Sequence, residues 1–173
     1  MTSAFLEESL ALLQRTPAVL DSLLRELPEG WTTATEGHGT WSPHDVMGHL
    51  VHVERTDWME RLARILAHGT SRPFDRLDRE AQFRETARPL PVLLDEFAAL
   101  RRDNLGRLRE WNLQPEQLGL QGTHPTLGPV TLGQVLAAWT AHDLGHTLQI
   151  ARVMARRYKE AAGPFADFFS VMR

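Results

Sequence analysis

Residues 131–157 read TLGQVLAAWTAHDLGHTLQIARVMARR, and this stretch carries the pattern that decides the fold. Its apolar residues recur every three or four positions, which is the spacing of one face of an α-helix. Thr131 is followed three residues later by Gln134, the spacing of a capping box at a helix start. The stretch therefore predicts a long amphipathic helix that begins at Thr131 and ends near Arg157.

Two histidines interrupt the apolar face of this helix. The face consists of Val135, Trp139, His142, His146, Ile150 and Val153. His142 and His146 stand at positions i and i+4, about 6 Å apart at Cβ, so both imidazoles can reach one metal ion at about 2.0–2.1 Å. The alternative is a pair of partly buried histidines that bond to carboxylates or carbonyls, and the spacing alone leaves both interpretations open.

A second helix is predicted from Ser42 to about Gly69. Ser42 can cap it, Pro43 suits its first position and Asp45 completes a capping box. His49 lies on its apolar face and could supply a third imidazole to an open metal site. His52 is the competitor, but it lies about 60° around the helix, on a face that is expected to be lateral or outward.

Two further helices complete a predicted bundle. One covers the first 27 residues, where Pro17 is expected to bend or interrupt it, and the other runs from Leu90 to Trp111. Residues 69–88 are expected to form a short helix or an exposed crossover, residues 112–130 are expected to form a loop, and no alternating run predicts more than a minor sheet. The chain is predicted to be one all-α domain, 1–173: a four-helix bundle with a long crossover loop and a short C-terminal helix around 165–171.

Composition narrows the classes of function. The 173 residues are 42% hydrophobic and 24% charged with a net charge of −3, which favours a folded protein and disfavours nucleic acid as a partner. The absence of cysteine excludes disulfides, thiolate ligands and a cysteine nucleophile. The sequence has no recognisable signal peptide and no apolar run of membrane-spanning length, so a cytoplasmic protein without a membrane partner is expected.

The segment HDLGH, residues 142–146, invites comparison with the HExxH motif of zinc peptidases. Here Asp143 takes the place of the glutamate, and its shorter carboxylate reaches less far as a general base. No predicted strand offers an edge for an extended peptide. A peptidase is therefore a minor alternative.

Two segments together resemble the DinB/YfiT-like family of metal-dependent enzymes. They are WSPHDVMGHLVHVER, residues 41–55, and LGPVTLGQVLAAWTAHDLGHTLQI, residues 127–150, and the likeness extends over most of the chain. The resemblance implies a four-helix bundle whose divalent ion, often nickel or zinc, is held by His49, His142 and His146. It also implies a homodimer. Some members use bacillithiol, mycothiol or glutathione in transferase or isomerase reactions, and many have no assigned reaction.

The chemistry of three neutral imidazoles is compatible with two reactions. A divalent ion on such a site can lower the pKa of bound water or stabilise a thiolate. Either a hydrolase or a thiol-dependent transferase acting on a small molecule is expected, and any thiol must be a low-molecular-weight cosubstrate. Zinc and nickel are the expected ions, with iron, cobalt or manganese as alternatives. A non-catalytic metal-stabilised binding module and a metal-free interaction bundle remain competing hypotheses.

Further side chains are candidates for the surroundings of the site. Trp41, Trp139 and His124 could form a pocket wall, although packing is the commoner role of a tryptophan on an apolar face. Asp143 could hold a ligand imidazole. Ordinary surface charge is nevertheless the favoured interpretation for Asp143, as it is for Glu54 and Asp57.

Overall fold

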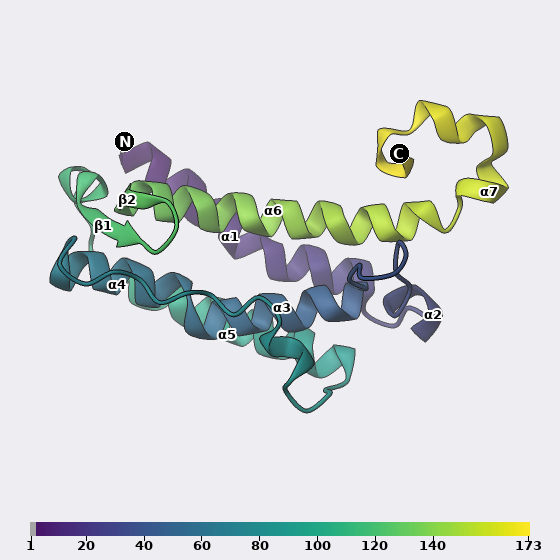
Figure 1. The fold of residues 1–173 in the computed structure, drawn as a ribbon, viewed down its shortest axis with the longest axis horizontal. Helices are drawn as coiled ribbons and strands as arrows, with labels where there is room; N and C mark the ends of the chain where they lie inside the picture. The colour runs from purple at the N-terminus through teal and green to yellow at the C-terminus, as the bar shows by residue number, and fades with distance from the viewer. Residues whose placement is uncertain (1–2) are drawn as a thin grey trace.

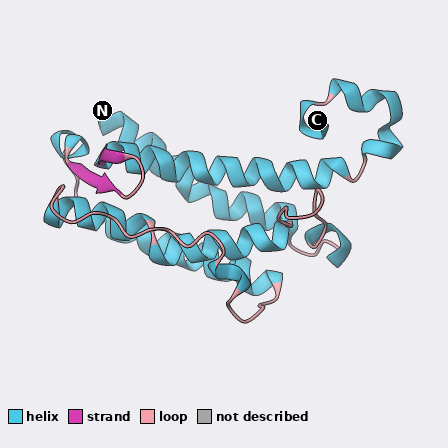
Figure 2. Cartoon of the chain, viewed as in Figure 1, coloured by secondary structure: helices cyan, strands magenta, loops and turns pink. Residues whose placement is uncertain are grey.

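The computed structural model describes residues 3–173, in which long helices form a bundle (Figure 1). Its helices are α1 (Ser3–Leu24), α3 (Pro43–Thr56), α4 (Trp58–His68), α5 (Leu90–Glu110) and α6 (Leu132–Arg156), and α3 and α4 follow one another along one side. Figure 2 shows that helices dominate the chain, with one small hairpin at one end. The predicted four-helix bundle is confirmed.

The order of the helices around the bundle differs from a simple up-and-down arrangement. The first helix, α1, packs against α5 and α6, and the pair α3–α4 packs against the same two helices. Consequently α1 lies diagonally opposite α3–α4. In Figure 1, α3–α4 and α5 run in one direction and α1 and α6 run in the other. The parallel course of α4 and α5 requires the predicted crossover, and residues 69–89 return along the whole length of α4 and α3.

Both predicted capping boxes are present, and they begin the two histidine-bearing helices. The hydroxyl of Ser42 accepts a hydrogen bond from the Asp45 N–H at 3.1 Å, and the Asp45 carboxylate accepts one from the Ser42 N–H at 2.9 Å. At α6 the hydroxyl of Thr131 accepts a hydrogen bond from the Gln134 N–H at 3.2 Å, and the side-chain oxygen of Gln134 accepts one from the Thr131 N–H at 2.8 Å. These caps satisfy N–H groups that have no partner within the helix.

The predicted second helix is wrong in one respect, because it is divided at Asp57. The φ angle of Asp57 is −116°, far from the helical value, and α4 begins at the next residue. The preceding residue, Thr56, donates its hydroxyl hydrogen to the His52 carbonyl at 2.8 Å. A hydroxyl that bonds to the carbonyl four residues back often bends a helix.

Pro17 lies inside α1 without interrupting it, so the expected break does not occur. Proline has no N–H, and the carbonyl of Leu13, four residues earlier, therefore loses its helical partner. That carbonyl accepts a hydrogen bond from Nη1 of Arg101 on α5 at 2.7 Å. A buried side chain thus replaces the missing backbone donor.

The connecting segments hold several short elements. They are α2 (Glu29–Thr32), η1 (Ala81–Phe83), η2 (Pro115–Gly119), and the antiparallel strands β1 (Gln121–His124) and β2 (Gly128–Thr131), in which Gln121 pairs with Thr131. The hairpin fits the minor sheet that the sequence allowed. The short C-terminal helix expected around 165–171 takes the form of the 3₁₀ turns η3 (Gly163–Phe168) and η4 (Ser170–Met172), which follow a single α-helical turn, α7 (Lys159–Ala162). Gly163, with φ of +54°, ends α7 just before Pro164.

Two apolar clusters fill the bundle, one toward each end. One includes Leu13, Val53 and Trp139, and the other includes Leu20, Leu50 and Ile150. Along α6, His142 and His146 fall between Trp139 of the first cluster and Ile150 of the second, whereas His49 on α3 lies among residues of the second cluster. None of the helices in the described part of the chain is both long and apolar enough to cross a membrane.

Candidate metal centre

Three imidazoles from two helices meet inside the bundle. Nε2 of His142 lies 3.2 Å from Nε2 of His49 and 3.1 Å from Nε2 of His146. One ring nitrogen from each of the three histidines lies within 4.8 Å of the others. His49 comes from the inward face of α3, and the other two come from successive turns of α6, as their spacing in the sequence requires.

The spacing of these nitrogens suits a shared metal ion. Two nitrogens bound at 2.0–2.1 Å to one tetrahedral ion lie about 3.4 Å apart. In the absence of an ion, His142 Nε2 faces two other nitrogens, and a neutral ring nitrogen either donates or accepts but does not do both. Three neutral imidazoles are the donor set of open sites for zinc and similar ions. The residues present therefore fit a divalent ion.

One outer contact orients the first of these ligands. Oε1 of Gln149 accepts a hydrogen bond from Nδ1–H of His146 at 2.8 Å, which leaves Nε2 of that ring unprotonated and facing the other histidines. The Nδ1 atoms of His49 and His142 are buried without a hydrogen-bond partner among residues 3–173. Gln149 thus selects the tautomer of His146 that a metal ligand needs.

Burial keeps the histidines in the neutral form. Burial, followed by the neighbouring imidazoles and the charge of Arg79, lowers the pKa of His49 to about 4 and that of His142 to about 3. Burial also lowers the pKa of His146, which the hydrogen bond to Gln149 and the charge of Asp143 oppose. Since a metal binds the unprotonated ring, no proton has to be displaced from these histidines at neutral pH.

Aromatic rings surround the three histidines. The ring of Trp41 lies parallel to that of His146, with 6.3 Å between centroids, and 5.0 Å from that of His49. The ring of Trp58, at the start of α4, meets His142 edge-on at 5.1 Å. Trp41 thus lies beside the three histidines, as the sequence suggested. Trp58 also lies beside them, and no pattern in the sequence indicated that position.

A buried network of charges lies next to the histidines, and it corrects the interpretation of two acids as surface groups. Arg101 on α5 donates to Glu54 at 2.8 and 2.9 Å and to Asp143 at 2.6 and 3.1 Å. Only 2% of Glu54 and 1% of Asp143 is exposed. Trp139 is fully buried and donates Nε1–H to Glu54 at 3.2 Å, so it packs in the core and does not line a pocket. Asp143 pairs with Arg101, and no hydrogen bond joins it to an imidazole in the part described.

A cavity of about 380 Å³ opens beside His142, at the end of the bundle that carries the hairpin. His124 lies on its wall, as the sequence suggested, and Nδ1 of this ring accepts hydrogen bonds from the N–H groups of Thr126 and Leu127 at 3.2 and 3.1 Å. The lining residues are Asp57, Trp58, Arg61, Arg76, Leu77, Arg79, His124, Pro125, Thr126 and His142. Asp57 is 7% exposed, so it is not a surface group either, and burial raises its pKa, against the charge of Arg61.

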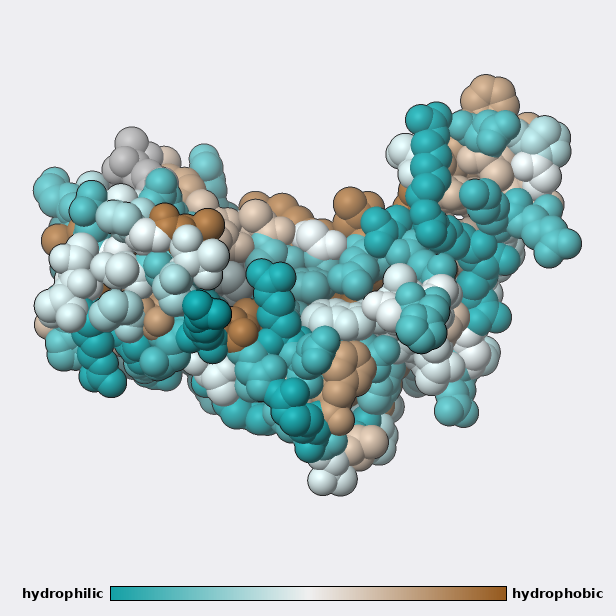
Figure 3. Space-filling model, viewed as in Figure 1, coloured by the Kyte–Doolittle hydropathy of each residue, from teal (hydrophilic) through white to brown (hydrophobic). Residues whose placement is uncertain are grey.

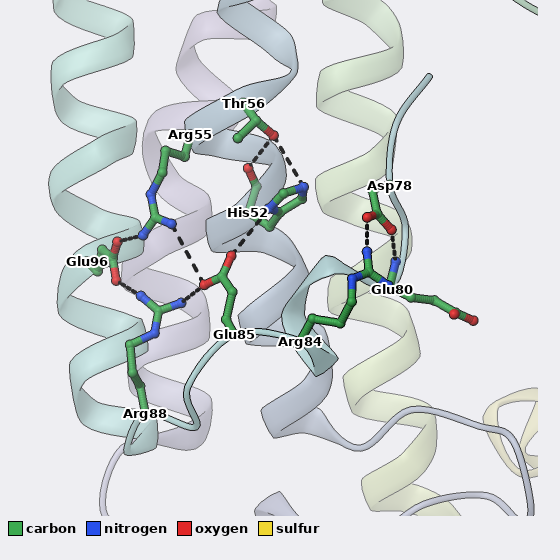
Figure 4. A network of polar contacts seen from close by, with 9 residues as sticks. All are labelled: His52, Arg55, Thr56, Asp78, Glu80, Arg84, Glu85, Arg88 and Glu96. Carbon is green, nitrogen blue, oxygen red and sulfur yellow. Dashed lines mark hydrogen bonds and ion pairs between the residues drawn. The ribbon is translucent and has the colours of Figure 1, made fainter. Parts of the chain in front are cut away.

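His52 lies outside the cluster of three histidines. Its Nδ1 faces Oε1 of Glu85 at 3.5 Å, and its Nε2 lies 3.4 Å from the Thr56 hydroxyl. In Figure 4 it belongs to a network that joins α3 to the crossover and to α5, through Glu85, Arg88 and Glu96. Of the two histidines weighed for α3, His49 is the one that meets those of α6.

Sequence reasoning missed the residues that the crossover brings to the site. Arg76 and Arg79 stand in a charged segment without periodicity, so nothing in the pattern places them beside His142. Arg101 carried a signal that was overlooked, because it lies four residues after Phe97 on the apolar face of α5. A charged residue on an otherwise apolar helix face breaks the pattern in the same way as His142 and His146 do on α6.

Fold and site together define a helical bundle with a candidate three-histidine metal centre. Residues 12–150 match the family model of the DinB superfamily, and the chain belongs to this superfamily. No curated protein matches the sequence. Among solved structures, YfiT from Bacillus subtilis, described as a probable metal-dependent hydrolase with an unusual four-helix bundle topology, is similar at a TM-score of 0.78 and 21% identity. The likeness covers 91% of this chain and 90% of that one, and it shows a shared fold.

Proposed function

We propose that this protein is a metal-dependent enzyme that acts on a small molecule, with hydrolysis as its first candidate reaction. The observation that carries the proposal is the convergence of the Nε2 atoms of His49, His142 and His146 beside a cavity. The description of YfiT as a probable metal-dependent hydrolase supports the choice of reaction. The three histidines would hold one divalent ion, with zinc or nickel favoured and iron, cobalt or manganese as alternatives.

An ion held there would lower the pKa of water or of a thiol and would polarise an acceptor group. The protein's own residues would prepare this chemistry. His49, His142 and His146 are neutral and so offer nitrogen lone pairs. Trp41 and Trp58 restrict the access of water to the rings. Because His142 also lines the cavity, a small substrate in the cavity would lie next to the site.

Thiol-dependent transfer is the second candidate. The chain has no cysteine, so a thiol nucleophile would be a second small molecule such as glutathione, bacillithiol or mycothiol. Such a cosubstrate needs room beside the histidines, and a cavity of about 380 Å³ falls within the usual range for small-molecule sites. A non-catalytic, metal-stabilised binding module is the competing outcome.

The metal is tested on protein purified without a histidine tag. We expect about one zinc or nickel ion per chain, and a melting temperature that falls when a chelator removes it, since a ligand at 100 times its Kd stabilises the fold by about 2.7 kcal/mol. His146→Ala should weaken metal binding by more than about 100-fold, beyond the usual cost of losing an outer contact. His52→Ala is the matched control and should bind metal normally. Equal metal binding by both variants would refute the assignment.

Activity is tested with the loaded protein. Hydrolysis of 4-nitrophenyl butyrate, and conjugation of glutathione to 1-chloro-2,4-dinitrobenzene, distinguish the two candidate reactions. We expect one of them to depend on the metal and to disappear in His146→Ala while His52→Ala retains it. Stoichiometric metal binding without either reaction, across a wider panel of esters, amides and thiols, would favour the binding module.

We also propose a homodimer, with a second copy on the outer face of α1 and α6. Leu12 and Val19 on α1, and Leu144 and Leu148 on α6, are exposed large apolar side chains. Figure 3 shows apolar patches along the edge of the molecule that α6 forms. Light scattering after size exclusion should give twice the 19.6 kDa mass of the chain, and Leu148→Asp should give the monomer mass.

A further inference from the structure

The cavity beside His142 carries more positive than negative charge on its wall. Arg61, Arg76 and Arg79 all line it, whereas the chain as a whole carries a net charge of −3. The charge is therefore concentrated at this place and is not a property of the whole surface. Asp57 is the only carboxylate among the lining residues of this cavity.

Two of the three arginines are free to bind something else. Nε of Arg61 donates to Oδ1 of Asp57 at 2.8 Å, so these two lining charges balance. Arg76 and Arg79 have no carboxylate within 4 Å in the structure of residues 3–173, and no hydrogen bond from either guanidinium is found there. The cavity wall therefore keeps two uncompensated guanidinium groups next to the candidate metal centre.

Carboxylates close to these arginines are already engaged elsewhere. Asp75 accepts a hydrogen bond from Arg64 at 2.6 Å, and Asp78 pairs with Arg84. Figure 4 shows Arg84 and Asp78 facing each other, while the Glu80 side chain points away from that pair. In residues 3–173, none of these acids forms an ion pair with Arg76 or Arg79.

The crossover is anchored on both sides of the two arginines. Before them, the N–H of Phe74 donates to the Thr123 carbonyl of the hairpin at 2.9 Å, and the Phe74 side chain is buried. After them, Glu85 and Arg88 join the network with Arg55 and Glu96 that Figure 4 displays. Between these anchors the chain holds Arg76 and Arg79 along the cavity.

We infer that this cavity is an anion-binding site in which Arg76 and Arg79 receive a carboxylate or phosphate group of the substrate. The inference rests on the proposed function and adds a substrate class to it. A planar guanidinium donates paired hydrogen bonds to either kind of oxyanion. A group bound there would place the rest of a small molecule toward His142, which lines the same cavity. Cationic substrates would be repelled.

Inorganic phosphate is the probe, measured by isothermal titration at constant ionic strength on metal-free protein so that it cannot bind the ion. We expect saturable binding to the unaltered chain and affinity at least about tenfold weaker in the double variant Arg76→Gln/Arg79→Gln, because both charged hydrogen-bond donors to the oxyanion are then gone. Arg72→Gln is the matched control: it removes an exposed arginine of the same crossover that does not line the cavity.

The outcomes separate this inference from the proposed function. No saturable phosphate binding up to about 50 mM, or equal affinity in the double variant and in Arg72→Gln, would overturn the inference. Zinc titrations of the same proteins test the metal site independently, and the double variant should bind zinc normally. Failure to bind zinc together with arginine-dependent phosphate binding would count against the enzyme proposal and leave the anion site standing.

Discussion

The imidazole of His142 lies between two others, with its Nε2 atom 3.2 Å from Nε2 of His49 and 3.1 Å from Nε2 of His146. At the scale of single residues, this crowding explains the chemistry of the site. Burial and mutual repulsion keep the rings neutral, and neutral rings are metal ligands. The same burial lowers the stability of the metal-free protein in acid, because the histidines of the unfolded chain bind protons that those of the folded chain do not.

The stability of metal-free protein should consequently depend on pH. The histidine pKa is about 6.5 in the unfolded chain but about 4 for His49 and about 3 for His142 in the folded one. Between these values the unfolded state holds more protons, so stability is retained above pH 6.5 and lost as the pH falls toward 4. Urea unfolding of chelator-treated protein from pH 7.5 to 5 should show this loss.

A pair of variants isolates the source of that pH dependence. The double variant His49→Gln/His142→Gln should lose much less stability over the same interval, because the two buried titrating groups are gone. His38→Gln, which replaces an exposed histidine, should behave like the unaltered chain. An unchanged slope in the double variant would show that other groups govern the acid sensitivity.

At the scale of elements, the hairpin and the crossover depend on each other. Strand β1 passes so close to α4 and the crossover that a Cβ on Gly122 would lie 2.6 Å from Cγ1 of Ile65 and 3.0 Å from the Phe74 ring. Glycine is required at position 122 because the side chains of Ile65 and Phe74 leave no room for a Cβ. The contact fixes the entry of the crossover, which then carries Arg76 and Arg79 past the site.

Gly122→Ala should therefore destabilise the protein by about 1–3 kcal/mol, the usual cost of overpacking a close contact. Gly119→Ala is the matched control, since a Cβ at that position meets nothing within 4 Å. Urea unfolding of the two variants gives the difference. Equal stability would mean that the hairpin can move away from Ile65 at no cost.

At the scale of the whole molecule, one guanidinium connects all four sides of the bundle. Arg101 on α5 bonds to the Leu13 carbonyl of α1, to Glu54 of α3 and to Asp143 of α6. Pro17 makes the first of these bonds possible, because it leaves the Leu13 carbonyl without a helical donor. The network separates the two apolar clusters and lies beside the histidines, so it sets the relative positions of the helices that carry them.

Arg101→Met should destabilise the protein by about 3–5 kcal/mol, because it leaves two carboxylates buried without their partner. The triple variant Arg101→Met/Glu54→Gln/Asp143→Asn should recover part of this loss, since this network then contains no buried charge. Arg102→Met, at an exposed neighbour, should change stability little. Denaturant unfolding measures all three, and a mild effect of Arg101→Met alone would contradict the argument.

The sequence by itself determined the long helices, both capping boxes and the three histidines that meet. These features depend on spacing within one helix or on residues next to a helix end, and such local geometry is written in the order of residues. Helical position favoured His49 over His52, and the resemblance to a known family implied the same residue. The division of the helix at Asp57 was not predicted, because neither proline nor glycine marks it in the sequence; a contact between the Thr56 hydroxyl and the His52 carbonyl accompanies it in the structure.

Only the tertiary structure decided what lies around the histidines. Glu54 and Asp143 looked like surface charges until Arg101 from another helix was placed between them, 47 and 42 residues away in the chain. Arg76 and Arg79 lie in a segment without periodicity, and their position follows from anchors on the hairpin and on α5. Contacts between distant residues depend on how elements pack, and no local spacing encodes them.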